Sequence, residues 1–240
     1  MKVTIHIWDL PLRLFHWLLV AAVPAAYITA KIGGPLIDWH GRIGIFIWGL
    51  LVFRIFWGFV GSTHARFLTF FPTISRLAAY FKGRWQGIGH NPLGALSVFA
   101  LLAVLIAQVG TGLFANDDIA YAGPLSGLVD KPLSDQLRGW HNTVFDLLAA
   151  LLVLHVLAIV FYRGVKKTNL VVPMLTGKKQ IAKALATSVS ANPASGFRAI
   201  GLILSLIISC IAMWGVSDGI AYLYHPGQSY QQTAQANPGF

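Results

Sequence analysis

Five stretches of this chain are each long enough and apolar enough to cross a lipid bilayer as a helix. They lie at about residues 12–31, 41–61, 92–115, 140–162 and 197–216. A bilayer core about 30 Å thick requires roughly 20 apolar residues per helix. A segment inside the hydrocarbon must satisfy its own backbone hydrogen bonds, and a helix does so. The sequence therefore predicts an all-α, integral membrane helical bundle.

The composition excludes the other broad classes of protein. Hydrophobic residues make up 56% of the chain and charged residues 11%, whereas a soluble domain carries about a quarter charged residues. A single cysteine, Cys210, excludes a disulfide scaffold. The net charge is +10, but the basic residues flank apolar runs, so nucleic-acid binding is not expected. The first apolar run is expected to stay as a span, since no convincing signal-peptide cleavage site follows it.

Lysine and arginine are distributed unevenly between the two ends of the predicted spans. Four lie on one side: Lys31, Arg42, Lys131 and Arg138. Thirteen lie on the side of the N-terminus: Lys2, Arg13, Arg66, Arg76, Lys82, Arg84, Arg163, Lys166, Lys167, Lys178, Lys179, Lys183 and Arg198. The positive-inside rule then predicts a cytoplasmic N-terminus and an external C-terminal tail.

Two connecting segments have their own character. Residues Thr73 to Lys82 predict a short helix lying at the membrane interface. The segment from Gly164 to Pro193 is polar and rich in Lys, Ser and Ala. It predicts an exposed linker with room for one short helix.

Four of the eight histidines lie in or at the mouths of predicted spans, where ionisable residues are costly and mark functional sites. His141 and His155 share the fourth span. At about 100° and 1.5 Å per residue they lie within roughly 40° of one face and about 21 Å apart. The first span enters from the inside and the second from the outside, so His16 is near the inner surface and His40 near the outer. Depth therefore pairs His16 with His155, and His40 with His141.

Two pairs of imidazoles at two depths match the axial ligation of two bis-histidine haems. Zinc and copper sites need three or four ligands in one place. The chain has no Cys-x-x-Cys-His motif for covalent haem attachment, so the haems are expected to be b-type. The alternative is that each histidine only hydrogen-bonds a neighbouring helix.

Haem propionates are anionic, and three arginines are candidate partners for them. Arg54 is 14 residues from His40, so it shares that face and lies at the depth of the inner haem. Arg13 and Arg138 each precede a proposed ligand by three residues and face the same way. Arg13 and Arg138 can also be read as boundary charges that extend into the headgroups. A buried Arg54, in contrast, needs an anion.

Oxidation of a quinol also requires a proton acceptor near a haem edge. Asp146, five residues after His141, is the candidate. The preferred alternative is that Asp146 pairs with Arg42 or hydrogen-bonds a neighbouring helix. His64 and His90 are weaker candidates on the cytoplasmic side, because boundary histidines usually face water.

Several short motifs carry a family resemblance when they are taken together. They are Trp8–Trp17, Trp39–Gly44, Phe53–Gly61 followed by Ala65–Phe67, Gly89–Ala95, Trp140–His141 with His155, and Thr176–Lys179. With these motifs the chain resembles the bacterial di-haem cytochromes b of the cytochrome b561 type. That family is related to the b-type cytochrome subunit of nickel–iron hydrogenases.

The resemblance covers roughly residues 4–180. It implies a four-helix haem-binding core with two b haems, whose ligands are His16 with His155 and His40 with His141. It also implies electron transfer in a bacterial inner membrane, between the quinone pool and a periplasmic redox protein such as a c-type cytochrome. The expected organisation is a di-haem transmembrane domain over 1–180, a cytoplasmic linker over 181–196, and a fifth helix with a periplasmic tail over 197–240.

The fifth span departs from the simplest members of that family and leaves the partner open. One alternative is a membrane cytochrome b anchor subunit of a hydrogenase or similar dehydrogenase complex. Another is a superoxide:quinone oxidoreductase. A non-redox transporter is a third, but it would need polar residues that converge at the midplane. The oligomeric state is not readable from the sequence.

Overall fold

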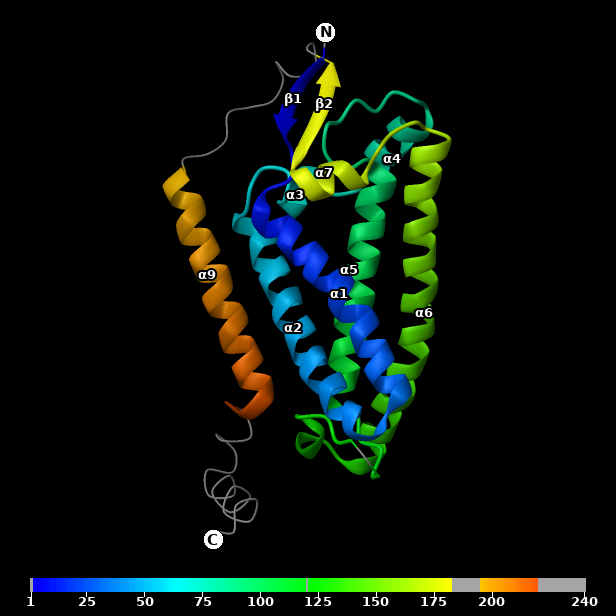
Figure 1. The fold of residues 1–240 in the computed structure, drawn as a ribbon, viewed down its shortest axis with the longest axis vertical. Coiled ribbons are helices and arrows are strands. Elements are labelled where there is room, and N and C mark those ends of the chain that lie inside the picture. The colour runs from blue at the N-terminus through cyan, green and yellow to red at the C-terminus, as the bar shows by residue number, and fades with distance from the viewer. Residues whose placement is uncertain (1, 120, 183–194, 220–240) are drawn as a thin grey trace.

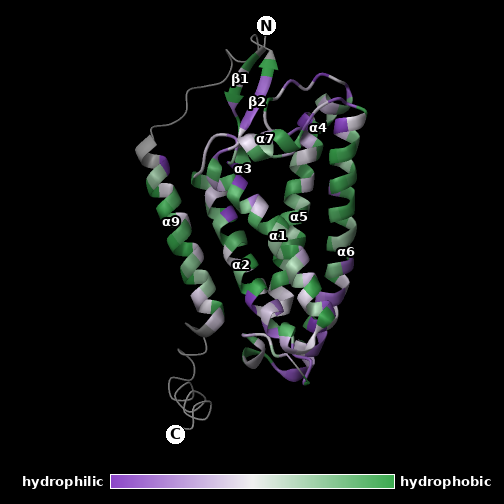
Figure 2. Ribbon diagram, viewed as in Figure 1, coloured by the Kyte–Doolittle hydropathy of each residue, from purple (hydrophilic) through white to green (hydrophobic). Residues whose placement is uncertain are grey.

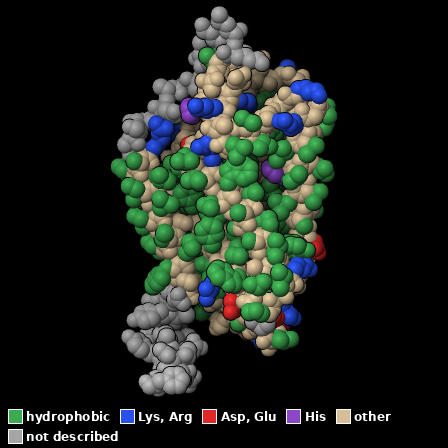
Figure 3. Space-filling view, in the orientation of Figure 1, with side chains coloured by type: hydrophobic (Ala, Val, Ile, Leu, Met, Phe, Trp, Pro, Cys, Tyr) green, Lys and Arg blue, Asp and Glu red, His purple; other side chains and the backbone are tan. Residues whose placement is uncertain are grey.

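The computed structural model describes residues 2–119, 121–182 and 195–219 (Figure 1). Five of the described helices are long and apolar enough to cross a membrane, as the sequence predicts. They are α1 (Leu10–Ile32), α2 (Ile37–Val60), α5 (Pro92–Phe114), α6 (Lys131–Gly164) and α9 (Ser195–Trp214). Apolar residues follow the middle of these helices, and polar residues gather towards both ends (Figures 2 and 3).

Three of the long helices begin with the same local signal. An Asp or Asn side chain caps the first turn, and a proline occupies one of the first two helical positions. The cap is Asp9 in α1, Asn91 in α5 and Asp130 in α6. Because Asp130 caps Leu133 at 3.1 Å, α6 starts at Lys131, well before the apolar span predicted from residue 140.

Helix α2 is the centre of the bundle. It packs against α1, α5 and α9, while α6 packs mainly on α5. Within the described residues, α1 and α6 barely touch each other. The bundle is thus closed along three of its sides and open between α1 and α6.

Helix α9 lies on the opposite flank of α2 from α6 (Figure 1). Small residues allow the close approach: the hydroxyl of Ser209 donates to the carbonyl of Gly49 at 2.5 Å. Met213 covers the same glycine, leaving no room there for a side chain. The π-helical turn η3 (Gly215–Gly219) follows. The predicted tail beyond it, and the linker over 183–194, lie outside the described residues.

A small polar layer covers the N-terminal end of the bundle. Strand β1 (Lys2–His6) pairs antiparallel with β2 (Lys178–Ala182), so that Ile5 lies opposite Lys179. The short helices α3 (Phe67–Phe70), α4 (Ile74–Phe81) and α7 (Val171–Thr176) lie beneath the strands. Helix α4, capped by Thr73, coincides with the helix predicted for the membrane interface.

The described part of the segment predicted as a linker, up to residue 182, holds the one short helix that the sequence allowed and also strand β2, which was not predicted. Helix α7 ends at Gly177, whose φ of +77° favours glycine. The carbonyl oxygen of Gly177 accepts a hydrogen bond from the amide of Ile7 at 2.8 Å. This turn carries the chain into β2 and ties it to the N-terminus.

At the opposite end, the 3₁₀ turn η1 (Gly34–Leu36) joins α1 to α2, and the turn η2 (Ser126–Leu128) lies in the connection from α5 to α6. Just inside this end, a buried apolar cluster fills the centre of the bundle. It includes Ile47, Leu51, Leu105, Val109 and Leu148. Four of them, Ile47, Leu105, Val109 and Leu148, line the cavity described next.

Candidate cofactor site

His40 of α2 and His141 of α6 meet across the bundle near the end opposite the N-terminus. Their ring centres are 6.1 Å apart and their planes are at 88°. The Nδ1 of His40 lies 2.8 Å from the carbonyl oxygen of Ala26, and the Nδ1 of His141 lies 2.8 Å from that of Gln108. A carbonyl only accepts, so each Nδ1 carries the proton and donates it. Each Nε2 is therefore the unprotonated nitrogen, and that of His141 accepts from the side-chain amide of Gln108 at 3.1 Å.

The separation of the two rings fits one metal ion between them. Two metal–imidazole bonds of about 2.0 Å in line, with about 1.1 Å from each nitrogen to its ring centre, place the ring centres roughly 6.2 Å apart. The observed separation is 6.1 Å. The distance between the ring centres is therefore compatible with a metal ion held by both rings.

A cavity of about 570 Å³ adjoins the two histidines, within the size range of cofactor sites. Glycines make room for it on both sides. A Cβ on Gly112 would come 2.8 Å from the Cε1 atom of His141, whereas Gly44 faces open space. The backbone thus allows a flat cofactor to approach both rings.

The mouth of the cavity lies between α1 and α6. From α1 it is lined by Tyr27 and Lys31, and from α6 by Asn142, Phe145 and Asp146. Lys31 and Asp146 are the charged residues of the lining. The lining therefore offers one cation and one anion at this polar end of the cavity.

The second predicted pair, His16 of α1 and His155 of α6, is half buried. The Nδ1 of His16 is buried and has no hydrogen-bond partner among the described residues. The structure does not show this pair in the ring contact seen for His40 and His141.

The three predicted arginines have different surroundings. Arg54 is 2% exposed, and its guanidinium lies 4.3 Å from the centre of the Phe67 ring. Its Nη1 atom has no hydrogen-bond partner in the described chain. Arg13 donates from Nη1 to the carbonyl oxygen of Leu175 at 2.6 Å, and its buried Nε is unpartnered within the described ranges. Both arginines therefore keep donors for a further acceptor.

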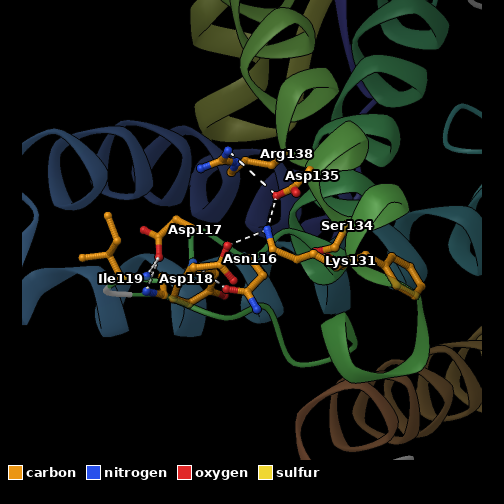
Figure 4. A network of polar contacts seen from close by, with 10 residues as sticks. Asn116, Asp117, Asp118, Ile119, Lys131, Ser134, Asp135 and Arg138 are labelled. Carbon is orange, nitrogen blue, oxygen red and sulfur yellow. Dashed lines mark hydrogen bonds and ion pairs between the residues drawn. The ribbon is translucent and has the colours of Figure 1, made fainter.

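Arg138 does not line the cavity. Its guanidinium faces Asp135, one turn earlier, with an N···O distance of 3.9 Å. Figure 4 shows this contact beside Lys131, which pairs with Asp118 and Asp135. The exposed Asp146 lines the cavity mouth. Its suggested partner, Arg42, instead lies 5.4 Å from the centre of the Trp39 ring.

His64 and His90 lie at the N-terminal end, away from the cavity. The ring of His90 is enclosed by Trp8 at 4.5 Å and Phe70 at 4.4 Å. Burial, with the cations Arg54 and Lys179 and the ring of His64 nearby, lowers the pKa of His90 to about 3. Burial and Lys179 also lower the pKa of His64. Both rings are therefore neutral near pH 7.

Sequence reasoning missed three contributors to the cavity: Gln108, Lys31 and the Tyr27–Phe145 contact. Gln108 is the one amide side chain inside the third span, which was a usable signal. Besides holding His141 through its backbone, its side-chain Nε2 lies 3.1 Å from the Nε2 of that ring. Lys31 entered the sequence reasoning only as a charge for the topology.

Comparison with known proteins gives a consistent result. The family described as prokaryotic cytochrome b561 matches residues 7–177. The chain is 27% identical to the "Probable Ni/Fe-hydrogenase B-type cytochrome subunit" of Azotobacter vinelandii, over 73% of this chain and 88% of that protein. It is 24% identical to the "Probable Ni/Fe-hydrogenase 1 B-type cytochrome subunit" of Escherichia coli K12, over 63% and 80% respectively. No solved structure matches the chain.

Proposed function

Since this chain belongs to the prokaryotic cytochrome b561 family, a family of membrane-embedded b-type electron-transfer proteins, we propose that it passes electrons across the bacterial inner membrane through two haem b groups. The observation that carries the proposal is the His40–His141 pair, with its 6.1 Å ring separation and adjoining cavity. His16 and His155 are proposed as the second pair, nearer the cytoplasm.

The residues of the chain would hold and orient the haems. His40 and His141 would be the ligands of the outer haem iron, and His16 and His155 those of the inner one. When bound, haem supplies a one-electron couple whose potential depends on its axial ligands and their hydrogen bonds. The carbonyls of Ala26 and Gln108 fix the tautomer and orientation of the outer pair and raise the basicity of each ligand. A haem held by two histidines of the chain would relay electrons rather than bind a small molecule.

We propose that the electrons pass between the quinone/quinol pool and a periplasmic redox protein such as a c-type cytochrome. A quinol releases two electrons and two protons, so the haem path takes the electrons one at a time and a base must take the protons. The exposed carboxylate of Asp146 at the cavity mouth is the proposed acceptor. The excess of Lys and Arg at the N-terminal end supports a cytoplasmic N-terminus and a periplasmic C-terminus.

Arg54 and Arg13 are proposed as partners of the inner haem carboxylates. Their support is the buried donors left without acceptors, Nη1 of Arg54 and Nε of Arg13, because a buried guanidinium without an acceptor is costly. We also propose that residues 1–180 form the haem-binding domain, 181–196 a linker, and 197–240 a separate fifth helix with its tail.

A second candidate function is that of a membrane subunit which accepts electrons from a hydrogenase. The similar chains of Azotobacter vinelandii and Escherichia coli carry that description. The haems and their ligands would be the same, and only the external donor would differ. Co-purification of a hydrogenase large subunit with the tagged chain, from cells grown with hydrogen, supports this candidate over the first.

The test is the haem-to-polypeptide ratio of detergent-purified protein, measured as pyridine haemochrome together with a reduced-minus-oxidised spectrum. We expect two b haems per chain, and one in each of the single variants His40→Ala, His141→Ala, His16→Ala and His155→Ala. His6→Ala is the matched control, because His6 is exposed on β1. Full haem content in all four ligand variants would overturn the proposal.

A further inference from the structure

We propose that Lys31, and not Arg138, is the cationic partner of the carboxylates of the outer haem. The inference rests on the proposed haem-binding function and adds a residue which that function does not itself specify. It concerns the only cationic side chain that lines the described cavity.

The position of Lys31 suits this role. It lies in the last turn of α1, at the polar end of the span, and its side chain is exposed at the mouth of the cavity. Its ammonium is 5.7 Å from the centre of the Tyr27 ring, which also lines the mouth. A long flexible side chain at this depth can keep its stem on the apolar wall and its charge at the polar edge. The carboxylate edge of a haem held by His40 would face the same end.

The other basic residues at this end of the bundle are engaged elsewhere. Arg42 lies over the Trp39 ring. Lys131 pairs with Asp118 at 2.5 Å and also with Asp135. Arg138 faces Asp135 from the far side of that carboxylate (Figure 4). None of the three lines the cavity, so an anionic group inside it meets Lys31.

The sign of the electrostatic effect follows from the charges. Haem carboxylates favour the ferric state, because their negative charge stabilises the more positive iron. A cation beside them offsets that preference and favours the ferrous state. Asp146, on the facing wall of the same mouth, acts in the opposite direction. Removal of Lys31 therefore lowers the reduction potential of the outer haem, and removal of Asp146 raises it.

The experiment is a redox titration of full-length protein in lipid nanodiscs, comparing Lys31→Gln with Arg138→Gln. The outer haem is identified as the spectral component missing from His141→Ala. For Lys31→Gln we expect the equilibrium constant for reduction of the outer haem to fall by up to about tenfold, which is about 59 mV for a one-electron couple. The reduction potential of the inner haem should not change. In Arg138→Gln and in Lys31→Arg, the reduction potential of the outer haem should equal that of the parent protein. In Asp146→Asn, this potential should be higher than in the parent.

Two results would overturn the inference. Unchanged potentials in Lys31→Gln would make Lys31 an ordinary boundary charge. A downward shift in Arg138→Gln without one in Lys31→Gln would return the role to Arg138. Both results require that the chain holds two haems and that His141→Ala loses one. Failure of that earlier requirement would count against the proposed function itself, so the two failures are distinguishable.

Discussion

Tyr27 of α1 and Phe145 of α6 form an offset stack, with their ring centres 5.1 Å apart and their planes 4° from parallel. The two rings belong to helices that otherwise barely touch within the described chain. They lie at the mouth of the cavity beside His40 and His141. The stack therefore closes the mouth by means of side chains instead of helix packing.

The variant Phe145→Ala is expected to release the outer haem faster. An aromatic stack contributes about 0.5–1.5 kcal/mol beyond the area it buries, which corresponds to roughly a two- to tenfold faster loss. Haem transfer to excess apomyoglobin, followed by absorbance, measures this rate. Tyr27→Phe keeps the stack and serves as the control. Equal rates for Phe145→Ala and the parent would mean that the stack does not retain the haem.

A methyl group on Gly112 is expected to empty the outer site. It would come 2.8 Å from Cε1 and 3.0 Å from Nδ1 of His141, so the ring must move off the Gln108 carbonyl. Gly112→Ala should therefore retain about one haem per chain where the parent retains two, measured as pyridine haemochrome. Gly110→Ala is the matched control two residues earlier, because a Cβ there meets nothing within 4 Å. Two haems in Gly112→Ala would show that the ring orientation is not required.

Asp9→Ala is expected to destabilise the protein more than Asp130→Ala. Both aspartates cap a helix, which is worth about 0.5–2 kcal/mol. Asp9 also accepts from the indole of the buried Trp57 at 3.1 Å, and an unsatisfied buried donor costs about 1–3 kcal/mol more. Thermal unfolding in detergent, followed by circular dichroism, compares the two. An equal loss of thermal stability in the two variants would mean that the Asp9–Trp57 hydrogen bond does not stabilise the protein.

Stability is expected to fall as the pH drops below about 6.5. Unfolded His90 takes up a proton near its usual pKa of 6.5, whereas burial and nearby cations hold the folded pKa at about 3. Between these values the unfolded state binds more protons, so acid favours unfolding, by at most about 1.4 kcal/mol per pH unit and group. His64, with a lowered pKa, acts in the same direction.

His90→Gln should therefore unfold with a weaker pH dependence between pH 6.5 and 4 than the parent. His6→Gln, at an exposed position on β1, should leave the dependence unchanged. Unfolding midpoints measured in detergent across this pH range decide the matter. A parental slope in His90→Gln would assign the acid sensitivity to other groups.

A chain that ends after residue 182 is expected to keep both haems. Helix α9 packs on α2 through Ser209 and Gly49, and the proposed ligands lie on α1, α2 and α6. The family match also ends at residue 177. Haem content per chain is the measurement, and a chain with fewer than two haems would make the fifth helix part of the haem-binding unit.

The sequence predicts the spans and part of the site because both depend on local patterns. Hydropathy marks the five helices, and depth along the fourth span brings His141 level with His40, whose ring it contacts. Their role as iron ligands stays a prediction. The β1–β2 pairing was not predicted, because residues so far apart in the chain leave no local signal for it. Arg138 shares a face with His141, but Asp135 one turn earlier attracts its guanidinium, and spacing alone does not reveal such competition.

The two ends of α1 are held in very different ways. Near the N-terminus, Arg13 and Trp17 donate to the carbonyls of Leu175 and Met174, and β1 is paired along its length with β2. At the far end, the stack of Tyr27 on Phe145 joins α1 to α6. Along its length α1 also packs on α2, and near the far end the carbonyl oxygen of Ala26 accepts from His40 of that helix at 2.8 Å. A displacement of α6 away from α1 and α2 would therefore break the ring stack, whereas the hydrogen bonds at the base of α1 do not involve α6.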